Sequence, residues 1–215
     1  MNRDILLLLM AVLVLSFGPL FARFIDMGAV EITWWRCLFA SLALAILLPL
    51  RRWHRVERKH LSWLMITGAL LGLHWWTFFL SIQLSSVSIG VVMLFTYPLF
   101  SALIEPWFTA ERFSNRQVLG GIGIILGVYL LVPEFSLDNS ITAGVLIGLL
   151  SALMYASRNI LTRHRLTEPP AMTTLFYQML SALPLLGLSV LLSVPEAGFP
   201  DADDLRYLLV LALGM

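Results

Sequence analysis

The sequence predicts an all-α fold, a bundle of helices that crosses a membrane several times. Hydrophobic residues make up 59% of the 215 residues and charged residues only 13%, with a mean hydropathy of +0.87. Soluble domains carry about 25% charged residues, so this composition excludes a soluble protein. The stretch from Gly68 to Ile104 contains no Lys, Arg, Asp or Glu. A stretch of that length without charge indicates membrane helices rather than a solvated surface.

Eight apolar runs follow one another, and a spanning helix needs about 20 residues. The first run is longer than the apolar core of a secretory signal, which has roughly 7–15 residues, so we interpret it as an uncleaved helix. A serine-rich turn joins the third and fourth runs, which predicts a transmembrane hairpin. The eighth run has barely begun where the sequence ends. In chain order the runs are Ile5–Ala22, Ile32–Leu50, Leu61–Ile82, Ser86–Ile104, Gln117–Pro133, Ile141–Leu161, Met172–Val194 and Leu205–Met215.

Basic residues predict how these helices are oriented. Eleven of the 14 Lys and Arg residues fall on one side when alternate connections are compared. The strongest basic loop, from Arg51 to Lys59, lies on that side. Because basic loops stay in the cytoplasm, we expect a multi-pass inner (plasma) membrane protein with a cytoplasmic N-terminus.

Proline and acidic residues predict where helices bend or begin. Pro98 lies inside the fourth run and is expected to kink that helix and free a carbonyl, which suits a gate. Pro19 is assigned the same role in the first run. Asp203 and Asp204 directly precede the last run, and one of them is expected to cap its helix.

The order of the runs also suggests an internal repeat. Five spans end on the outer side, so a second copy of the same unit must be inverted relative to the first. We expect a first five-helix repeat over residues 1–134 and a partial second repeat over residues 141–215, with helices 6, 7 and the start of 8. Inverted repeats are typical of secondary transporters, whose site lies near the midplane. On this interpretation the chain is a fragment of a longer protein.

Four segments resemble the drug/metabolite transporter (DMT) superfamily, and specifically the EamA-type permeases. They are GPL through Arg23 with ITWWR ending at Arg36, FFLSIQLSSVSIGVVMLFTYPLFSALIEP, AERFSNRQVLGGIGIILGVYLL, and GVLIGLLSALMYASRNILTR. Such permeases have ten helices in two five-helix repeats. The resemblance implies a transporter in which two inverted halves move around a central cavity, and the missing C-terminal region is the departure from the pattern.

Polar and aromatic residues at membrane depth are the candidate site, because polar groups there are costly and tend to be functional. On the third run, His74, Phe78, Ser81 and Ser85 share one helical face. The alternative for His74 is a hydrogen bond to a neighbouring helix. His74 and Glu105 are the candidates for proton coupling. The candidate cavity residues are Arg36, His74, Trp75, Phe78, Tyr97, Tyr155, Asn159 and Gln178.

Two charged candidates have a structural alternative. Arg36, taken as the only charge well inside a span, has two interpretations. It either anchors an anionic or carboxylate group of the substrate, or it has a structural role, in which it reaches the outer interface or pairs with Glu31 or Asp26; we favour the structural role slightly. Glu105 is expected to pair with Arg112 or Arg116 rather than to carry a proton.

Small residues predict close packing. Gly144, Gly148 and Ser151 form a stripe on the sixth run that indicates a tight helix contact. Gly120, Gly123 and Gly127 on the fifth run indicate either tight packing or contact with a second copy of the chain.

Enzyme functions find no support, because the sequence contains no HExxH, GxSxG or P-loop motif and no cluster of metal ligands. We expect no cofactor and no nucleic-acid partner. The expected partners are a small-molecule substrate, the lipid bilayer and a second copy of the chain in a homodimer. The predicted function is export of small metabolites, amino-acid-like or amphipathic and drug-like, by alternating access. The alternatives are a proton-coupled exporter like the small multidrug-resistance proteins, a non-transporting membrane sensor or assembly protein, and an inert truncated product.

Overall fold

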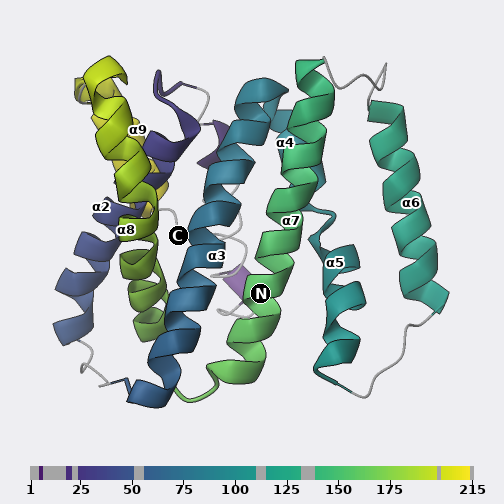
Figure 1. Cartoon of the computed structure of the whole chain (residues 1–215), viewed down its shortest axis with the longest axis horizontal. Helices are drawn as coiled ribbons and strands as arrows, with labels where there is room; N and C mark the ends of the chain where they lie inside the picture. The colour runs from purple at the N-terminus through teal and green to yellow at the C-terminus, as the bar shows by residue number, and fades with distance from the viewer. Residues whose placement is uncertain are drawn as a thin grey trace.

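The computed structural model of the chain describes residues 5–6, 18–20, 24–50, 56–109, 115–131, 139–197 and 200–213. Over these residues it is a bundle of helices with no strand. The helices stand side by side and run alternately up and down (Figure 1). Their bounds are α2 Ala29–Leu50, α3 Arg58–Leu84, α4 Val87–Leu94, α5 Tyr97–Ile104, the short 3₁₀ helix η1 Glu105–Trp107, α6 Asn115–Leu131, α7 Ser140–Arg165, α8 Ala171–Ala197 and α9 Ala202–Leu213.

Five of the described segments are long and apolar enough to cross a membrane, which confirms the predicted fold class. They are Ala29–Ile46, Arg58–Leu84, Val87–Trp107, Ser140–Arg165 and Ala171–Leu191. In α6 the apolar part is shorter, Leu119–Leu130. Of the predicted first span, Ile5–Ala22, only residues 5–6 and 18–20 are described, as helix, so the expected kink at Pro19 stays a prediction.

Several helices extend further than the apolar runs, because charged side chains at their ends reach the bundle edge and do not interrupt the backbone. The third helix begins at Arg58 rather than Leu61, and α7 continues to Arg165 rather than ending at Leu161. Arg158 therefore lies two turns inside α7. The expectation that Arg36 is the only charge well inside a span is wrong.

Polar side chains cap the helix starts. The Glu31 carboxylate accepts a hydrogen bond from the Gly28 N–H at 2.7 Å, at the start of α2. Asn139 caps α7 through the Ile141 N–H at 2.9 Å. At α9 the cap is Asp201, whose Oδ1 accepts from the N–H groups of Asp203 and Asp204 at 2.9 and 2.8 Å. The expected cap at Asp203 or Asp204 is therefore wrong by two or three residues.

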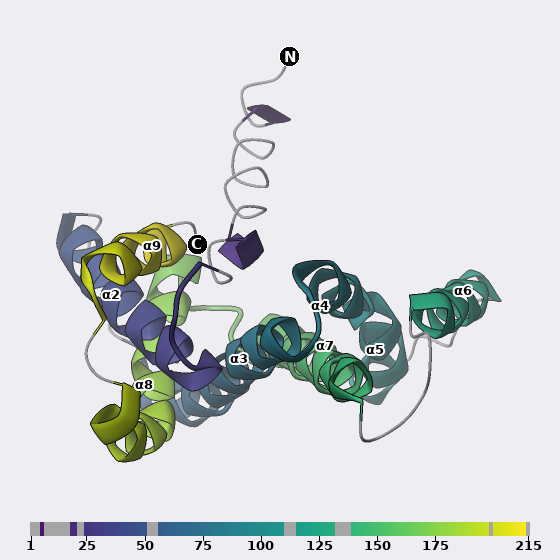
Figure 2. The same ribbon diagram turned by 90° about the horizontal axis from the view of Figure 1, so that it is seen from above.

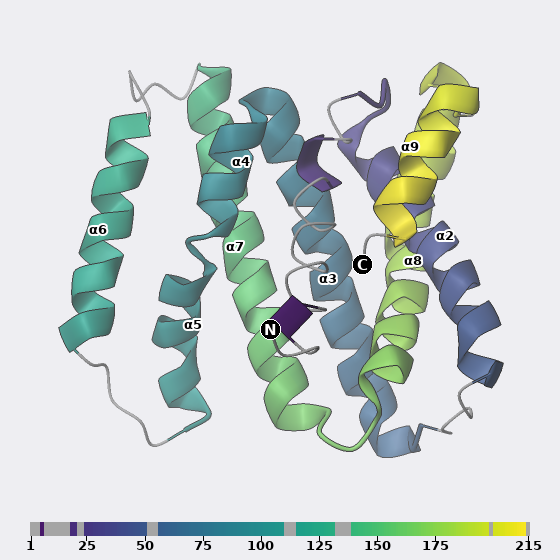
Figure 3. The same cartoon turned by 180° about the vertical axis from the view of Figure 1, so that it is seen from behind.

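The fourth apolar run is broken into two helices. The break falls at Phe95 and Thr96, two residues before Pro98, which lies in the first turn of α5 (Figure 3). Proline offers no N–H to the carbonyl four residues earlier. For Pro98 that carbonyl belongs to Leu94. One residue earlier, the Met93 carbonyl accepts from both the Thr96 hydroxyl and the Thr96 N–H, at 2.6 and 3.0 Å. The helix break is thus stabilised locally by Thr96.

The central helix of the bundle is α3. Viewed from above, it lies between a group formed by α2, α8 and α9 and a group formed by α4, α5 and α7, with α6 at the outer edge (Figure 2). Two apolar clusters join α3 to the group of α2, α8 and α9. In one, Phe79 of α3 packs with Ile32 of α2 and Leu208 of α9. In the other, Leu71 of α3 packs with Met179 of α8. The buried side chains of α3 therefore contact helices of both groups.

Glycines let α3 and its neighbours approach closely. A Cβ added at Gly148 would lie 2.7 Å from the Met93 Cβ, and one at Gly72 would lie 2.9 Å from the Ala182 Cβ. By contrast, a Cβ at Gly120, Gly123 or Gly127 would meet nothing within 4 Å. The tight packing expected of these three glycines is therefore absent within the described part of the chain, and a contact with a second copy stays a prediction.

Candidate functional site

His74 lies in α3 and is buried against α7. Its Nδ1 is 2.8 Å from the Ser151 hydroxyl oxygen and 3.1 Å from the Ser151 carbonyl oxygen. The Ser151 hydroxyl in turn donates to the His74 carbonyl at 3.0 Å. Residues 77 positions apart in sequence are thereby joined by a closed set of hydrogen bonds.

These contacts assign the proton on the imidazole. A carbonyl oxygen only accepts hydrogen bonds, so the contact to the Ser151 carbonyl requires a proton on Nδ1. The Ser151 hydroxyl proton is already directed at the His74 carbonyl, so its oxygen also accepts from Nδ1. In the neutral ring Nε2 then keeps its lone pair and is the nitrogen that can accept a hydrogen bond from another group.

Aromatic rings connect His74 to the broken helix. The His74 and Tyr155 ring centroids are 4.8 Å apart, and those of Tyr155 and Tyr97 are 5.1 Å apart with the rings nearly perpendicular. Tyr97 is the first residue of α5, directly after the break. Three of the residues predicted from sequence, on α3, α7 and α5, thus form one continuous contact chain.

The rest of the predicted α3 face packs against α7. The Ser81 hydroxyl donates to the Gly144 carbonyl at 2.7 Å, and Phe78 is buried beside His74. The Ser85 hydroxyl donates to the Ser81 carbonyl of its own helix at 2.6 Å. The small stripe expected on α7 is the surface that receives this face, as the hydrogen bond to Gly144 shows.

Arg36 of α2 is buried against the face of α3 that carries Trp75 and Phe79, which adjoins the face with His74 and Phe78, and 9% of its surface is exposed. Its guanidinium lies 4.3 Å from the centroid of the Trp75 ring and 5.7 Å from that of Phe79. The structural alternative is wrong: the side chain does not reach solvent, and no ion pair joins it to Glu31 or Asp26. The Nε of Arg36 has no hydrogen-bond partner among the described residues. The substrate-anchoring role stays a prediction.

A second polar cluster joins α3, α7 and α8 around Gln178, which is fully buried. The Gln178 amide donates to the hydroxyls of Thr67 and Thr162, at 2.9 and 3.2 Å. Its carbonyl accepts from the Arg158 guanidinium, which also donates to the Asn159 side chain at 2.9 Å. The two predicted residues Asn159 and Gln178 are therefore brought together by Arg158, which was not among the predicted site residues.

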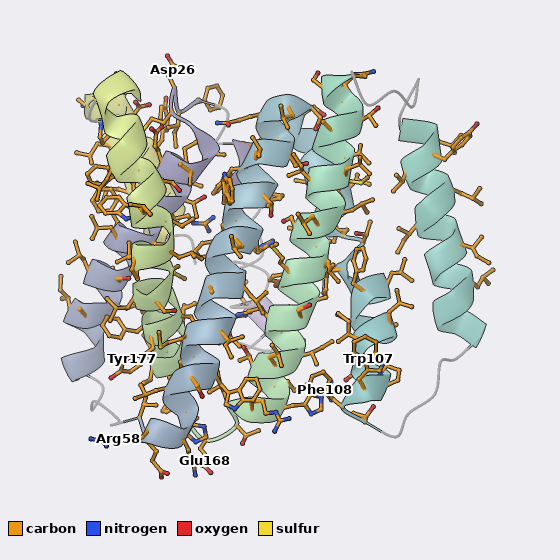
Figure 4. The ribbon with its side chains drawn as sticks, in the orientation of Figure 1. Asp26, Arg58, Trp107, Phe108, Glu168 and Tyr177 are labelled. Atoms are coloured by element: carbon orange, nitrogen blue, oxygen red, sulfur yellow. The ribbon has the colours of Figure 1, made fainter. Side chains whose placement is uncertain are left out.

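Glu105 begins the short helix η1, whose Trp107 lies at the end of the bundle that carries Arg58 and Glu168, called the basic end below (Figure 4). The Glu105 carboxylate pairs with Arg163 of α7 at 2.8 Å. The expected partners were Arg112 and Arg116; Arg112 and the side chain of Arg116 lie outside the described residues. Its proton-coupling role stays a prediction, as do the gating roles of Pro19 and Pro98.

Sequence reasoning missed Ser151 as a partner of His74 and missed Arg158 altogether. Arg158 could have been found if the sixth helix had been expected to continue to Arg165, because Arg158 then lies two turns inside the helix. No group of three or more His, Cys, Asp or Glu side chains in the described part of the chain is placed to hold a metal ion.

Comparison with known proteins places the chain in a family. The EamA-like transporter family matches residues 2–132, more than half of the chain. The uncharacterized transporter YxxF of Bacillus subtilis (strain 168) is 24% identical over 219 aligned residues, covering 96% of this chain and 67% of the relative. No solved structure matches significantly. The resemblance carried by the four sequence segments is confirmed: the chain belongs to the EamA-like transporter family, and it is a multi-pass membrane transporter.

Proposed function

We propose that this chain is a secondary-active transporter that exports small metabolites, amino-acid-like or amphipathic, by alternating access. The substrate binds near the middle of the membrane, where α3, α7 and the break between α4 and α5 meet. Because the sequence contains no P-loop, the proposed energy source is a gradient of an ion or of the substrate itself.

The observation that carries this proposal is the contact chain His74, Tyr155 and Tyr97 beside a broken helix. Helices interrupted at membrane depth commonly form the substrate sites of secondary transporters, because their free backbone groups can bind polar parts of a ligand. A polar side chain at that depth is costly and is a candidate for function. In the neutral ring His74 offers Nε2 as an acceptor at this place.

The proposed orientation puts the basic end in the cytoplasm and the N-terminus on the same side, in the inner (plasma) membrane. Arg58, Lys59, Arg163 and Arg165 gather at that end, and Asp26 lies at the other (Figure 4). Basic residues flanking membrane helices stay in the cytoplasm, which supports this arrangement.

The experiment that tests the proposal is transport by the purified chain in lipid vesicles. Movement of labelled amino acids and amphipathic dyes along an imposed proton or substrate gradient is measured for the wild type and for His74→Ala. The matched control is Thr77→Val, one turn away on α3. Thr77 is buried like His74, but its hydroxyl bonds only within its own helix, to the carbonyls of Leu73 and His74 at 2.7 and 3.0 Å.

The expected result is gradient-driven movement by the wild type and Thr77→Val, and at least a tenfold slower rate for His74→Ala. Equal rates in all three proteins would remove His74 from the pathway and leave the transporter intact. A folded wild type that moves no compound of the panel would contradict the proposed function.

A further inference from the structure

Among the described residues, two arginines lie well inside membrane-spanning helices, the buried Arg36 and the half-buried Arg158. The Nε of each has no hydrogen-bond partner, but the contacts of their other nitrogens differ. Arg158 donates to the side-chain oxygens of Asn159 and Gln178, so two of its nitrogens are satisfied by neutral amides. Arg36 makes no hydrogen bond to a described residue, and its contacts are the rings of Trp75 and Phe79. A guanidinium held by amides has a structural role, whereas one held only by rings still lacks acceptors for its N–H groups.

The carboxylates near Arg36 in sequence do not supply these acceptors. Glu31 is buried, but its carboxylate is committed to the Gly28 N–H at 2.7 Å. Asp26 is exposed, and no ion pair with Arg36 is formed. Among the described residues, therefore, the positive charge of Arg36 has no counter-charge, although charges buried in proteins and membranes are ordinarily paired.

The geometry around Arg36 favours one class of ligand. A guanidinium presents a planar fork of N–H groups that matches the two oxygens of a carboxylate. The Trp75 ring lies 4.3 Å from the guanidinium carbon and holds the fork from one side by a cation–π contact. Arg36 is seven residues from the start of α2, so it lies about 10 Å below that end of the helix.

We propose that Arg36 binds the carboxylate of an anionic solute, which identifies the substrate class as small carboxylic acids. This inference rests on the proposed transport function and names what that function carries. Phe79 and Trp75 form the apolar wall beside the fork, so an acid with a short aromatic or aliphatic body fits better than a bare anion.

The test is binding rather than transport. The chain is placed in nanodiscs of uncharged lipid, and calorimetric titrations compare benzoate, phenylacetate and 3-phenylpropionate with their amides. Each acid and amide share one shape and differ in charge, and titration of empty nanodiscs corrects for partition into lipid. We expect at least one acid to bind about tenfold more tightly than its amide, as a charge-assisted contact predicts.

Variants then locate the contact. In Arg36→Gln the acid and its amide are expected to bind about equally tightly. Arg36→Lys keeps the charge but not the planar fork, so its preference for the acid is expected to lie between those of the wild type and Arg36→Gln. The control is Arg206→Gln, which removes the same charge from an exposed position where the arginine pairs with Asp203 at 2.9 Å. That variant keeps the preference for the acid.

Each outcome decides the inference. If the wild type binds every acid no better than its amide, or if Arg36→Gln folds and keeps the preference, the inference is wrong. Should Arg36→Gln fail to fold, Arg36→Lys and the wild-type comparison of acids with amides decide instead. Selective binding without movement of any acid would keep this inference and remove the proposed function. Transport without a preference for acids would keep the proposed function and contradict this inference.

Discussion

At the scale of single residues, the two nitrogens of His74 have different tasks. Nδ1 is hydrogen-bonded to Ser151. In the proposed function, Nε2 is the nitrogen that accepts a hydrogen bond from the substrate. Asparagine places its amide nitrogen near the position of Nδ1, and glutamine reaches only the position of Nε2. The two substitutions can therefore separate packing from transport.

His74→Asn is expected to unfold with a free energy within about 1 kcal/mol of the wild type, because the hydrogen bond to Ser151 survives. His74→Gln is expected to lose about 1–2 kcal/mol, because both hydrogen bonds from Nδ1 to Ser151 are lost, each worth roughly 0.5–1.5 kcal/mol. Equilibrium unfolding in detergent measures both values. We expect His74→Asn to be the stable variant that nevertheless transports slowly. The reverse order of stability would assign the proton to Nε2.

How much of the site the sequence predicts also depends on single residues. His74, Tyr97, Tyr155 and Gln178 were identified because polar and aromatic groups stand out in apolar runs. Their partners were not, because Ser151 meets His74 only once the register between α3 and α7 is set, across 77 positions of sequence. Local pattern carries no information about that register.

At the scale of helices, glycine is used in two ways that the sequence does not distinguish. Gly148 faces α3 and α4, where a Cβ would lie 2.8 Å from the Ser81 hydroxyl and 2.7 Å from the Met93 Cβ. Gly123 faces no described atom within 4 Å. Both lie in apolar helices with similar spacing, so only the packing separates them.

Gly148→Ala is expected to lower the free energy of unfolding by about 1–3 kcal/mol, because the added methyl group forces α3 and α7 apart. Gly123→Ala is expected to raise it by up to about 1 kcal/mol, since alanine favours the helix and meets no clash. Unfolding of the two variants in detergent tests this. If Gly123→Ala instead destabilises the protein and lowers its measured mass in detergent from that of a dimer to that of a monomer, the α6 glycines form a contact between copies.

The broken fourth helix shows what sequence does predict at this scale. Pro98 indicated the interruption, and the break lies two residues before it because Thr96 closes the preceding turn. The ends of α3 and α7 were missed, because hydropathy ends where charge begins whereas a helix continues as long as its backbone bonds do.

At the scale of the whole molecule, the basic end is held by contacts between elements that are distant in sequence. Lys59 and His60 at the start of α3 reach Glu168 in the loop between α7 and α8, each at 3.1 Å. Glu105 pairs with Arg163. If the protein works by alternating access, ion pairs of this kind must break when the pathway opens toward the basic end.

The contacts of Glu168 with Lys59 and His60 predict that stability depends on pH. Hydrogen bonds from His60 and from Lys59 hold the pKa of the Glu168 carboxyl below its usual value. A carboxyl group whose pKa is lower in the folded state stabilises the fold above its unfolded pKa, about 4.3 for glutamate, and this contribution is lost as the pH falls through the lowered folded value.

Glu168→Gln is therefore expected to unfold at a lower temperature than the wild type at pH 7, and the difference is expected to close as the pH falls from about 5 to about 3. The size is small, because Glu168 is exposed and solvent screens its charge. Thermal unfolding of both proteins across that range tests the prediction. Glu57→Gln is the matched control, since Glu57 pairs with Lys59 at 3.2 Å without reaching another element. A difference that stays constant with pH would mean that Glu168 acts through its shape and not its charge. A pH-dependent difference means that ionisation of one loop residue contributes to joining α3 to the turn between α7 and α8.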